Sequence, residues 1–210
     1  MSEPGFTRAE RRLITMHRTP RVVQRWLRLL SYNWEREGKT LRSFRGVVRH
    51  KTAHCLEAAL AVAAIMEQHG YPPLVLDLES QDRLDHVVFA FRVGKRWGAV
   101  GGSRDVGLHG RRPLFRSPRD LASSYYEPYI DLHARIVGYA LVDLRDLGRY
   151  DWRTSERNIW KVERFLIRRP HRRLRTSDAQ YRRLREAYRE YIETHPPTGT
   201  PHTRGKHTWM

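Results

Sequence analysis

Residues 52–69 read TAHCLEAALAVAAIMEQH, and residues 86–100 read HVVFAFRVGKRWGAV. In the first stretch, small and apolar residues recur with helical spacing after Thr52, a residue type that caps helices, and Gly70 ends the pattern. In the second, two apolar runs flank Gly94 and Lys95, a two-residue turn typical of an antiparallel hairpin. With the apolar run 74–78, these stretches predict an α+β fold in which one helix packs on a small antiparallel sheet.

Helices are expected on both sides of this unit. Thr19 and Pro20 begin a helical pattern that stops at Gly38. Residues 101–110 contain four glycines and are expected to form a mobile, exposed loop. The other predicted elements are a helix from Ser117 to about Tyr129, a strand over 139–144, and two basic helices, one after Thr154 and Ser155 and the other after Ser177.

The 210 residues are expected to form one domain with appendages. An arm covers 1–18, the core 19–150, a basic helical extension packed on that core 151–193, and a disordered tail 194–210. Hydrophobic residues make up 40% of the chain and aromatic residues 10%, which excludes an extended disordered protein. The longest apolar run, 58–66, is too short to cross a bilayer, which takes roughly 20 residues, so no membrane contact is expected.

Cys55 is the single cysteine, so no disulfide within the chain is possible. A lone cysteine suits a reducing compartment, and the first thirty residues do not resemble a secretory signal. These observations predict a cytoplasmic protein.

Positive charge is concentrated in the two flanks. The net charge is +8 over residues 1–50, +1 over 51–150 and +8 over 151–210, for a total of +17. The densest basic run includes Arg168, Arg169, Arg172, Arg173 and Arg175. Such a run is usually a solvated helix face, and it is also the pattern of a surface that binds nucleic acid or an acidic protein.

Cys55 and His86 form the candidate chemical site. Cys55 falls in the first turn of the predicted helix, where free N–H groups and the helix dipole favour a thiolate. His86 opens the strand that follows and is placed to act as a general base if the helix start docks on that strand end. A buried filler cysteine and a hydrogen-bonded edge histidine are the structural alternatives.

Along the chain, a cysteine at a helix start is followed by an Asp-His pair that opens a strand, a Trp on the returning strand and an acidic residue beyond it. This order resembles that of the transglutaminase-like superfamily, whose fold is related to papain-like cysteine peptidases, and within it a little-characterised bacterial branch. The resemblance runs from about residue 21 to about residue 160, and its motifs are Ala53-His54-Cys55-Leu56-Glu57, Asp85-His86-Val87-Val88 and Trp97-Gly98-Ala99-Val100. It implies a Cys-His-Asp triad that transfers acyl groups through a thioester, from an amide or peptide substrate. It implies no cofactor and no metal.

The third residue of the triad departs from the family pattern. The acid commonly lies where the returning strand passes its Trp, and Gly101 occupies that place. Asp105 is the candidate acid if the glycine loop folds back, and Ser103 or a backbone carbonyl is the alternative partner of the imidazole. Gln24 is a further candidate, as a donor to an oxyanion. The competing function is an inactive scaffold of the same fold that binds a polyanion through its basic flanks.

Overall fold

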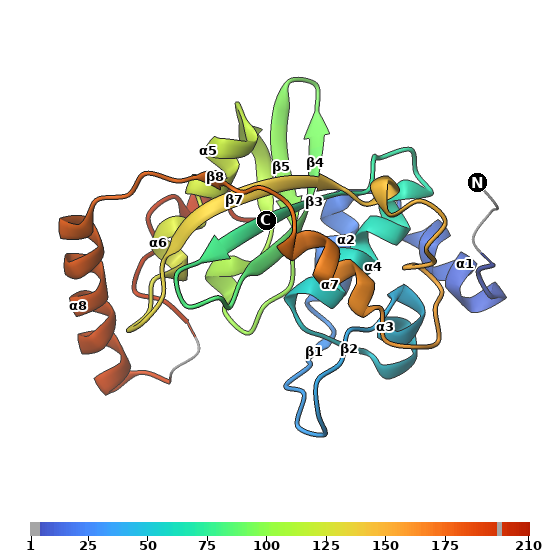
Figure 1. Cartoon of the computed structure of the whole chain (residues 1–210), viewed down its shortest axis with the longest axis horizontal. Helices are drawn as coiled ribbons and strands as arrows, with labels where there is room; N and C mark the ends of the chain where they lie inside the picture. Colours follow the sequence, from blue (N-terminus) through green and yellow to red (C-terminus); the bar gives the residue numbers. More distant parts are fainter. Residues whose placement is uncertain (1–4, 197–198) are drawn as a thin grey trace.

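A helix whose residues are almost all buried packs against the sheet and against neighbouring helices. It lies in the helical part of the molecule, beside the sheet (Figure 1). The computed structural model describes residues 5–196 and 199–210. In helix α4 (Cys55–Glu67), every residue from 56 to 66 is buried. A helix that is apolar on all sides needs cover on all sides, and here the cover comes from a sheet and from neighbouring helices.

The expected mixed α+β class is confirmed. The described residues form eight α-helices, of which the remaining seven are α1 (Arg8–Met16), α2 (Pro20–Leu27), α3 (Phe44–His50), α5 (Pro118–Ser123), α6 (Tyr126–Tyr129), α7 (Trp160–Ile167) and α8 (Asp178–Thr194). The main sheet is antiparallel throughout, with the strand order β6 (Arg111–Phe115), β5 (Arg96–Val100), β4 (His86–Val93), β3 (Leu74–Ser80), β7 (Ile136–Asp143) and β8 (Arg172–Arg173).

The two faces of the sheet carry separate cores. Because side chains alternate along β3, Val75 lies on one face of the sheet and Leu76 on the other. The first core holds α4 with buried residues of α2, α3 and α7, and the second holds buried residues of α5, α6 and α8. The hairpin β4–β5 forms over the predicted residues, and Gly94 at its turn has a φ of +55°. The register pairs His86 with Leu78, which places the histidine at one end of the sheet.

The helix expected to run to Gly38 is shorter in the structure. α2 ends at Leu27, because the following chain forms β1 (Ser31–Tyr32), which pairs in parallel with β2 (Thr52–Ala53). The backbone of Thr52 belongs to that pair, so the N-cap of α4 is His54 and not Thr52. Cys55 is consequently the first residue of the helix.

The region 101–110 is not the exposed loop that its glycines suggest. It contains a short 3₁₀ helix, η1 (Val106–Leu108), and Gly101, Gly107 and Gly110 are buried. A side chain at Gly110 would collide with Gln24 and with the carbonyl of Ala99. The glycines therefore serve close packing, and strand β6, which the sequence did not predict, follows directly.

The tail 194–210 was expected to be disordered; residues 197–198 of it lie outside the described residues, and residues 199–210 make specific contacts with the rest of the chain. His202 is buried, with its Nε2 atom 3.0 Å from the Leu184 carbonyl on α8. The Met210 N–H donates to the Gly110 carbonyl at 3.0 Å. These contacts to α8 and to the glycine-rich region hold a segment whose composition alone indicates no structure.

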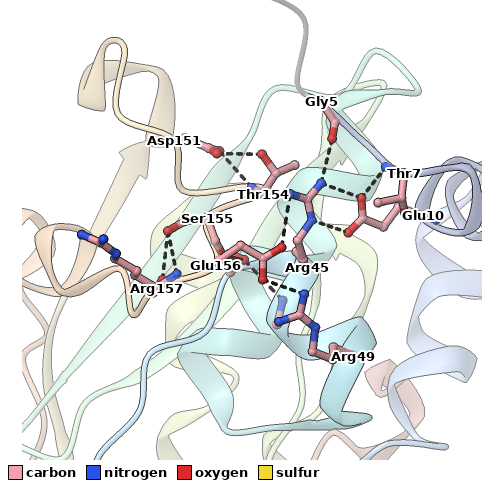
Figure 2. Close-up of polar contacts among 12 residues, drawn as sticks. Gly5, Thr7, Glu10, Arg45, Arg49, Asp151, Thr154, Ser155, Glu156 and Arg157 are labelled. Atoms are coloured by element: carbon pink, nitrogen blue, oxygen red, sulfur yellow. Dashed lines mark hydrogen bonds and ion pairs between the residues drawn. The ribbon is translucent and has the colours of Figure 1, made fainter.

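An ion-pair network joins the N-terminal arm to the core (Figure 2). Arg45 on α3 donates from Nε and Nη2 to the two carboxylate oxygens of Glu10, at 2.8 and 3.0 Å. Burial of Glu10 raises its pKa, but the bonds from Arg45 and from Thr7 outweigh this and lower it. At the outer end of the network, Arg49 pairs with Glu156 at 2.6 Å, and both side chains are more than half exposed.

Removing the inner arginine is expected to cost far more stability than removing the outer one. Arg45→Met leaves the buried Glu10 carboxylate without its charged partner and should lower the free energy of unfolding by about 2 kcal/mol. Arg49→Met breaks only an exposed pair and should cost less than about 1 kcal/mol. Urea denaturation of the two variants measures both values. Equal losses would contradict the anchoring role of the Arg45–Glu10 pair.

Candidate functional site

Cys55 lies at the wall of a cavity of about 400 Å³, within the size range of small-ligand sites. The cavity is also lined by His54 and His86, and the cysteine itself is half-buried. Its Sγ atom is 3.9 Å from the carbonyl oxygen of Asp85. The structure thus places the start of α4 against the start of β4, as the two motifs require.

A buried carboxylate fixes the start of α4. Glu57 is fully buried and accepts hydrogen bonds from the Asn33 side chain at 2.9 Å, the Thr40 hydroxyl at 2.9 Å and the Arg42 N–H at 2.8 Å. It also accepts from the backbone N–H of His54 at 3.2 Å. Because three donors come from the 33–42 loop and the fourth from the residue that precedes the helix, one side chain holds the loop and the helix start together.

His86 is oriented by a backbone carbonyl. The imidazole is 3% exposed, and its Nε2 atom is 2.9 Å from the carbonyl oxygen of Leu108 at the end of η1. A carbonyl accepts only, so Nε2 carries the proton, and Nδ1 is the ring atom that remains to act on the thiol. This is the arrangement of a general base with a fixed tautomer.

His54 is a second imidazole at the thiol. Its Nε2 atom is 3.1 Å from the Thr40 carbonyl and 3.7 Å from Glu57. Burial alone would lower the pKa of His54, but its hydrogen bond to Cys55 and the negative charge of Glu57 raise it to about 9. His54 is therefore positively charged at neutral pH.

The two histidines make Cys55 acidic. Burial raises the pKa of the thiol, but hydrogen bonds from His54 and His86 and the positive charge of both rings outweigh burial and lower that pKa to about 5. Free cysteine titrates near 8.5. At neutral pH the sulfur is therefore a thiolate, at a helix start and facing a cavity.

Asp105 and Ser103 line the same cavity but are not bonded to His86. The carboxylate of Asp105 accepts from the Gly199 N–H at 2.6 Å and pairs with Arg104 at 3.4 Å. The Ser103 hydroxyl accepts from the Asp105 N–H at 3.2 Å. The position expected of the acid is taken by the Leu108 carbonyl, so the carbonyl alternative is the one that the geometry supports.

Gln24 is a structural clamp and not an oxyanion donor. It is 1% exposed, and its Nε2 donates to the Gly101 carbonyl at 2.9 Å. Its Oε1 accepts from the N–H groups of Gly101 and Gly110, both at 3.1 Å. With both ends of the amide engaged, Gln24 holds α2 against the end of β5.

The arginine cluster lies at a second cavity, of about 1050 Å³. Four of the five candidate arginines line it, together with Arg119 and the 139–143 part of β7: Arg169, Arg172, Arg173 and Arg175. Arg168 does not line it. Arg169 pairs with Asp146 at 3.0 Å, whereas Arg172 and Arg173 are exposed on β8.

No known family model and no curated protein match the sequence. Within residues 5–196 and 199–210, no helix combines the length and apolarity needed to span a membrane. The same described residues contain no group of three His, Cys, Asp or Glu side chains placed to hold a metal ion.

The acidity of Cys55 predicts its reactivity across pH. The alkylation rate with iodoacetamide should be constant above neutral pH and fall as the pH drops through about 5, because only the thiolate reacts. His54→Ala and His86→Ala should each move this midpoint toward the ordinary value of about 8.5. The alkylation rates are measured by quenching the reaction at set times and determining the intact mass of the protein.

His133→Ala is the matched control, since it removes an exposed histidine away from the cavity. It should leave the midpoint unchanged. A midpoint near 8.5 in the unmodified protein, or no movement in either site variant, would contradict the thiolate assignment.

Proposed function

We propose that this protein is a cysteine-dependent acyl-transfer enzyme of the transglutaminase-like type, acting on an amide or peptide carbonyl through a thioester. The observation that carries the proposal is the Cys55 thiol itself, with a pKa lowered to about 5, which begins a helix and faces an open cavity. A structural cysteine needs neither the thiolate nor the access. The proposed chemistry requires no cofactor.

The order of helices and strands along the chain also supports a transglutaminase-like enzyme. A nucleophile at the start of a buried helix, a histidine at the start of a later strand of the sheet and a hairpin that returns beside that strand occur here in α4, β4 and β5. This is the order that the motif resemblance implies for a transglutaminase-like core.

In the proposed mechanism, Cys55 is the nucleophile and His86 moves the proton. In the resting site Nδ1 of His86 holds the proton that the thiol has given up, and the Cys55 thiolate attacks the carbonyl carbon to form a C–S bond. The Cys55 N–H, free at the helix start, donates to the oxyanion. Collapse breaks the C–N bond, and the amine leaves with the proton from His86. Water or a second amine then attacks the thioester, with His86 again accepting the proton.

His54 has a different part. With a pKa raised to about 9, it keeps its proton through the cycle and stabilises the thiolate by charge. It is a positioning residue that does not exchange protons with substrate. The two imidazoles thereby separate charge stabilisation from proton transfer.

An activated ester tests the acyl-transfer step directly. With p-nitrophenyl acetate we expect a burst of nitrophenolate and an acetyl group on Cys55, detected by intact mass after acid quenching. His86→Ala should slow acylation at neutral pH by about tenfold or more, because a smaller fraction of Cys55 is then thiolate. Asp105→Asn should slow it far less, since the carboxylate is not bonded to His86.

Cys55→Ser is the control for the site of acylation and should remain unacetylated. An ester hydrolysed at the same rate by Cys55→Ser and by the unmodified protein would sink the proposal. Equal losses in Asp105→Asn and His86→Ala would restore Asp105 to the triad.

The second candidate function is binding of an extended acidic protein segment in the arginine-lined cavity. β8 pairs with β7 only at Gly138 and Tyr139, so in the described chain no strand covers that side of β7 from residue 140 to 143. An open strand edge can accept an added strand, and arginines beside it can pair with carboxylates. Tyr181 of the basic extension is buried, which removes one aromatic ring that nucleobase stacking would need.

Binding of a labelled oligoglutamate peptide measures this candidate function. Anisotropy should show salt-dependent binding that survives Cys55→Ala and weakens at least about tenfold in the double variant Arg172→Glu, Arg173→Glu. The matched control, Arg182→Glu with Arg183→Glu, makes the same charge change on the exposed side of α8 and should bind normally. Equal weakening in both double variants, or tighter binding of a DNA oligonucleotide, would contradict the acidic-segment reading.

A further inference from the structure

The cavity beside Cys55 has a charge balance opposite to that of the whole chain. The sequence carries 40 basic and 23 acidic residues. Among the described residues that line the cavity, seven bear carboxylates and two bear guanidinium groups. The Cys55 thiolate offsets the charge of His54, so this pair does not change the balance. A cleft lined mainly by one sign of charge concentrates ligands of the other sign, so this cavity favours cations.

One carboxylate of the cavity is buried and only half satisfied. Asp77 on β3 is 2% exposed, and its Oδ2 atom is 3.2 Å from Nε2 of His171. Its Oδ1 atom meets no hydrogen-bond donor anywhere in the described chain. Alternation from Val75 puts Asp77 on the sheet face that α4 and α7 cover, where it lines the cavity. A buried acceptor without a donor is costly, and a donor on a bound ligand removes that cost.

A second carboxylate, that of Asp85, lines the same cavity as Asp77. The carbonyl of Asp85 is the group 3.9 Å from the Cys55 sulfur. Burial raises the pKa of the Asp85 carboxyl, and the negative charge of Asp77 raises it further, against the hydrogen bond from Ser80. The two carboxylates are thus close enough to repel each other, and a cation between them relieves the repulsion.

The remaining walls in this part of the cavity are aliphatic. Leu56 of α4, Val87 of β4, and Leu166 and Ile167 of α7 line it. Aliphatic walls with carboxylates among them match a lysine or arginine side chain, whose stem is apolar and whose tip is charged. A small cation without a stem would leave these walls exposed to water.

We infer that the cavity takes a substrate with a lysine or arginine side chain at the residue whose carbonyl Cys55 attacks, with the basic tip donating to Asp77. The inference rests on the proposed acyl-transfer function and adds its substrate class. His171 shares Asp77 with that tip, through the oxygen that the ligand does not need.

Two active-site reagents that differ only in charge test the inference. An N-acyl lysyl chloromethyl ketone and its norleucyl analogue share the reactive group, in which the Cys55 thiolate displaces chloride and forms a C–S bond. We expect the lysyl reagent to modify Cys55 at least about tenfold faster, measured by intact mass. Asp77→Asn should bring the ratio of the two rates close to one by slowing the lysyl reagent alone.

Glu186→Gln is the control, because it removes an exposed carboxylate on α8 outside the cavity and should keep the preference. Glu163→Gln is the second variant: it removes an exposed carboxylate of the cavity on α7, cannot disturb the Asp77–His171 pair, and should reduce the preference if Asp77→Asn does not fold. Equal rates for the two reagents on the unmodified protein would overturn the inference and leave acyl transfer standing. Failure of both reagents to label Cys55 faster than a free cysteine would overturn both.

Discussion

The Glu57 carboxylate is the constraint on which the site depends. It is fully buried, and burying a carboxylate without partners is too costly for a folded domain to tolerate. Its donors come from the 33–42 loop and from the backbone of His54, so the loop, the end of β2 and the start of α4 can satisfy it only in one arrangement. That arrangement sets the position of Cys55, and it gives His54 a negative neighbour within 3.7 Å. The same side chain therefore determines both the geometry and the charge of the candidate site.

Burial and charge act on Cys55 in opposite directions, and charge prevails. The surroundings of α4 are apolar, and burial alone would keep the thiol protonated. Two imidazoles and a helix start reverse this, because each interacts with the anion more strongly where water is scarce. Helix α4 thus has two roles. Its apolar residues form the core between the sheet and the neighbouring helices, and its first residue, Cys55, lines the cavity.

Local patterns in the sequence predicted the elements that carry the site but not the contacts that complete it. The spacing in α4 and the hairpin β4–β5 depend on local propensity, and both form close to the predicted residues. The roles of His54 and Leu108 depend on tertiary contacts, and a carbonyl has no signature in a sequence. The cap moved from Thr52 to His54 because β2 pairs with a distant strand. The tail appeared unstructured by composition, yet the contacts of His202 and Met210 with distant segments order it.

A carbonyl in place of an acid beside His86 is consistent with the rest of the site. A carboxylate partner stabilises an imidazolium, which matters most where the histidine must remove the proton of a weakly acidic nucleophile. Here the His54 charge already favours the thiolate, so His86 has less need of base strength. In the proposed mechanism its other task is to protonate the departing amine, and an imidazolium without an anionic partner gives up its proton more readily. The Leu108 carbonyl fixes the ring and its tautomer without opposing that transfer, so the second histidine offsets the acid that the family pattern leads one to expect at this position.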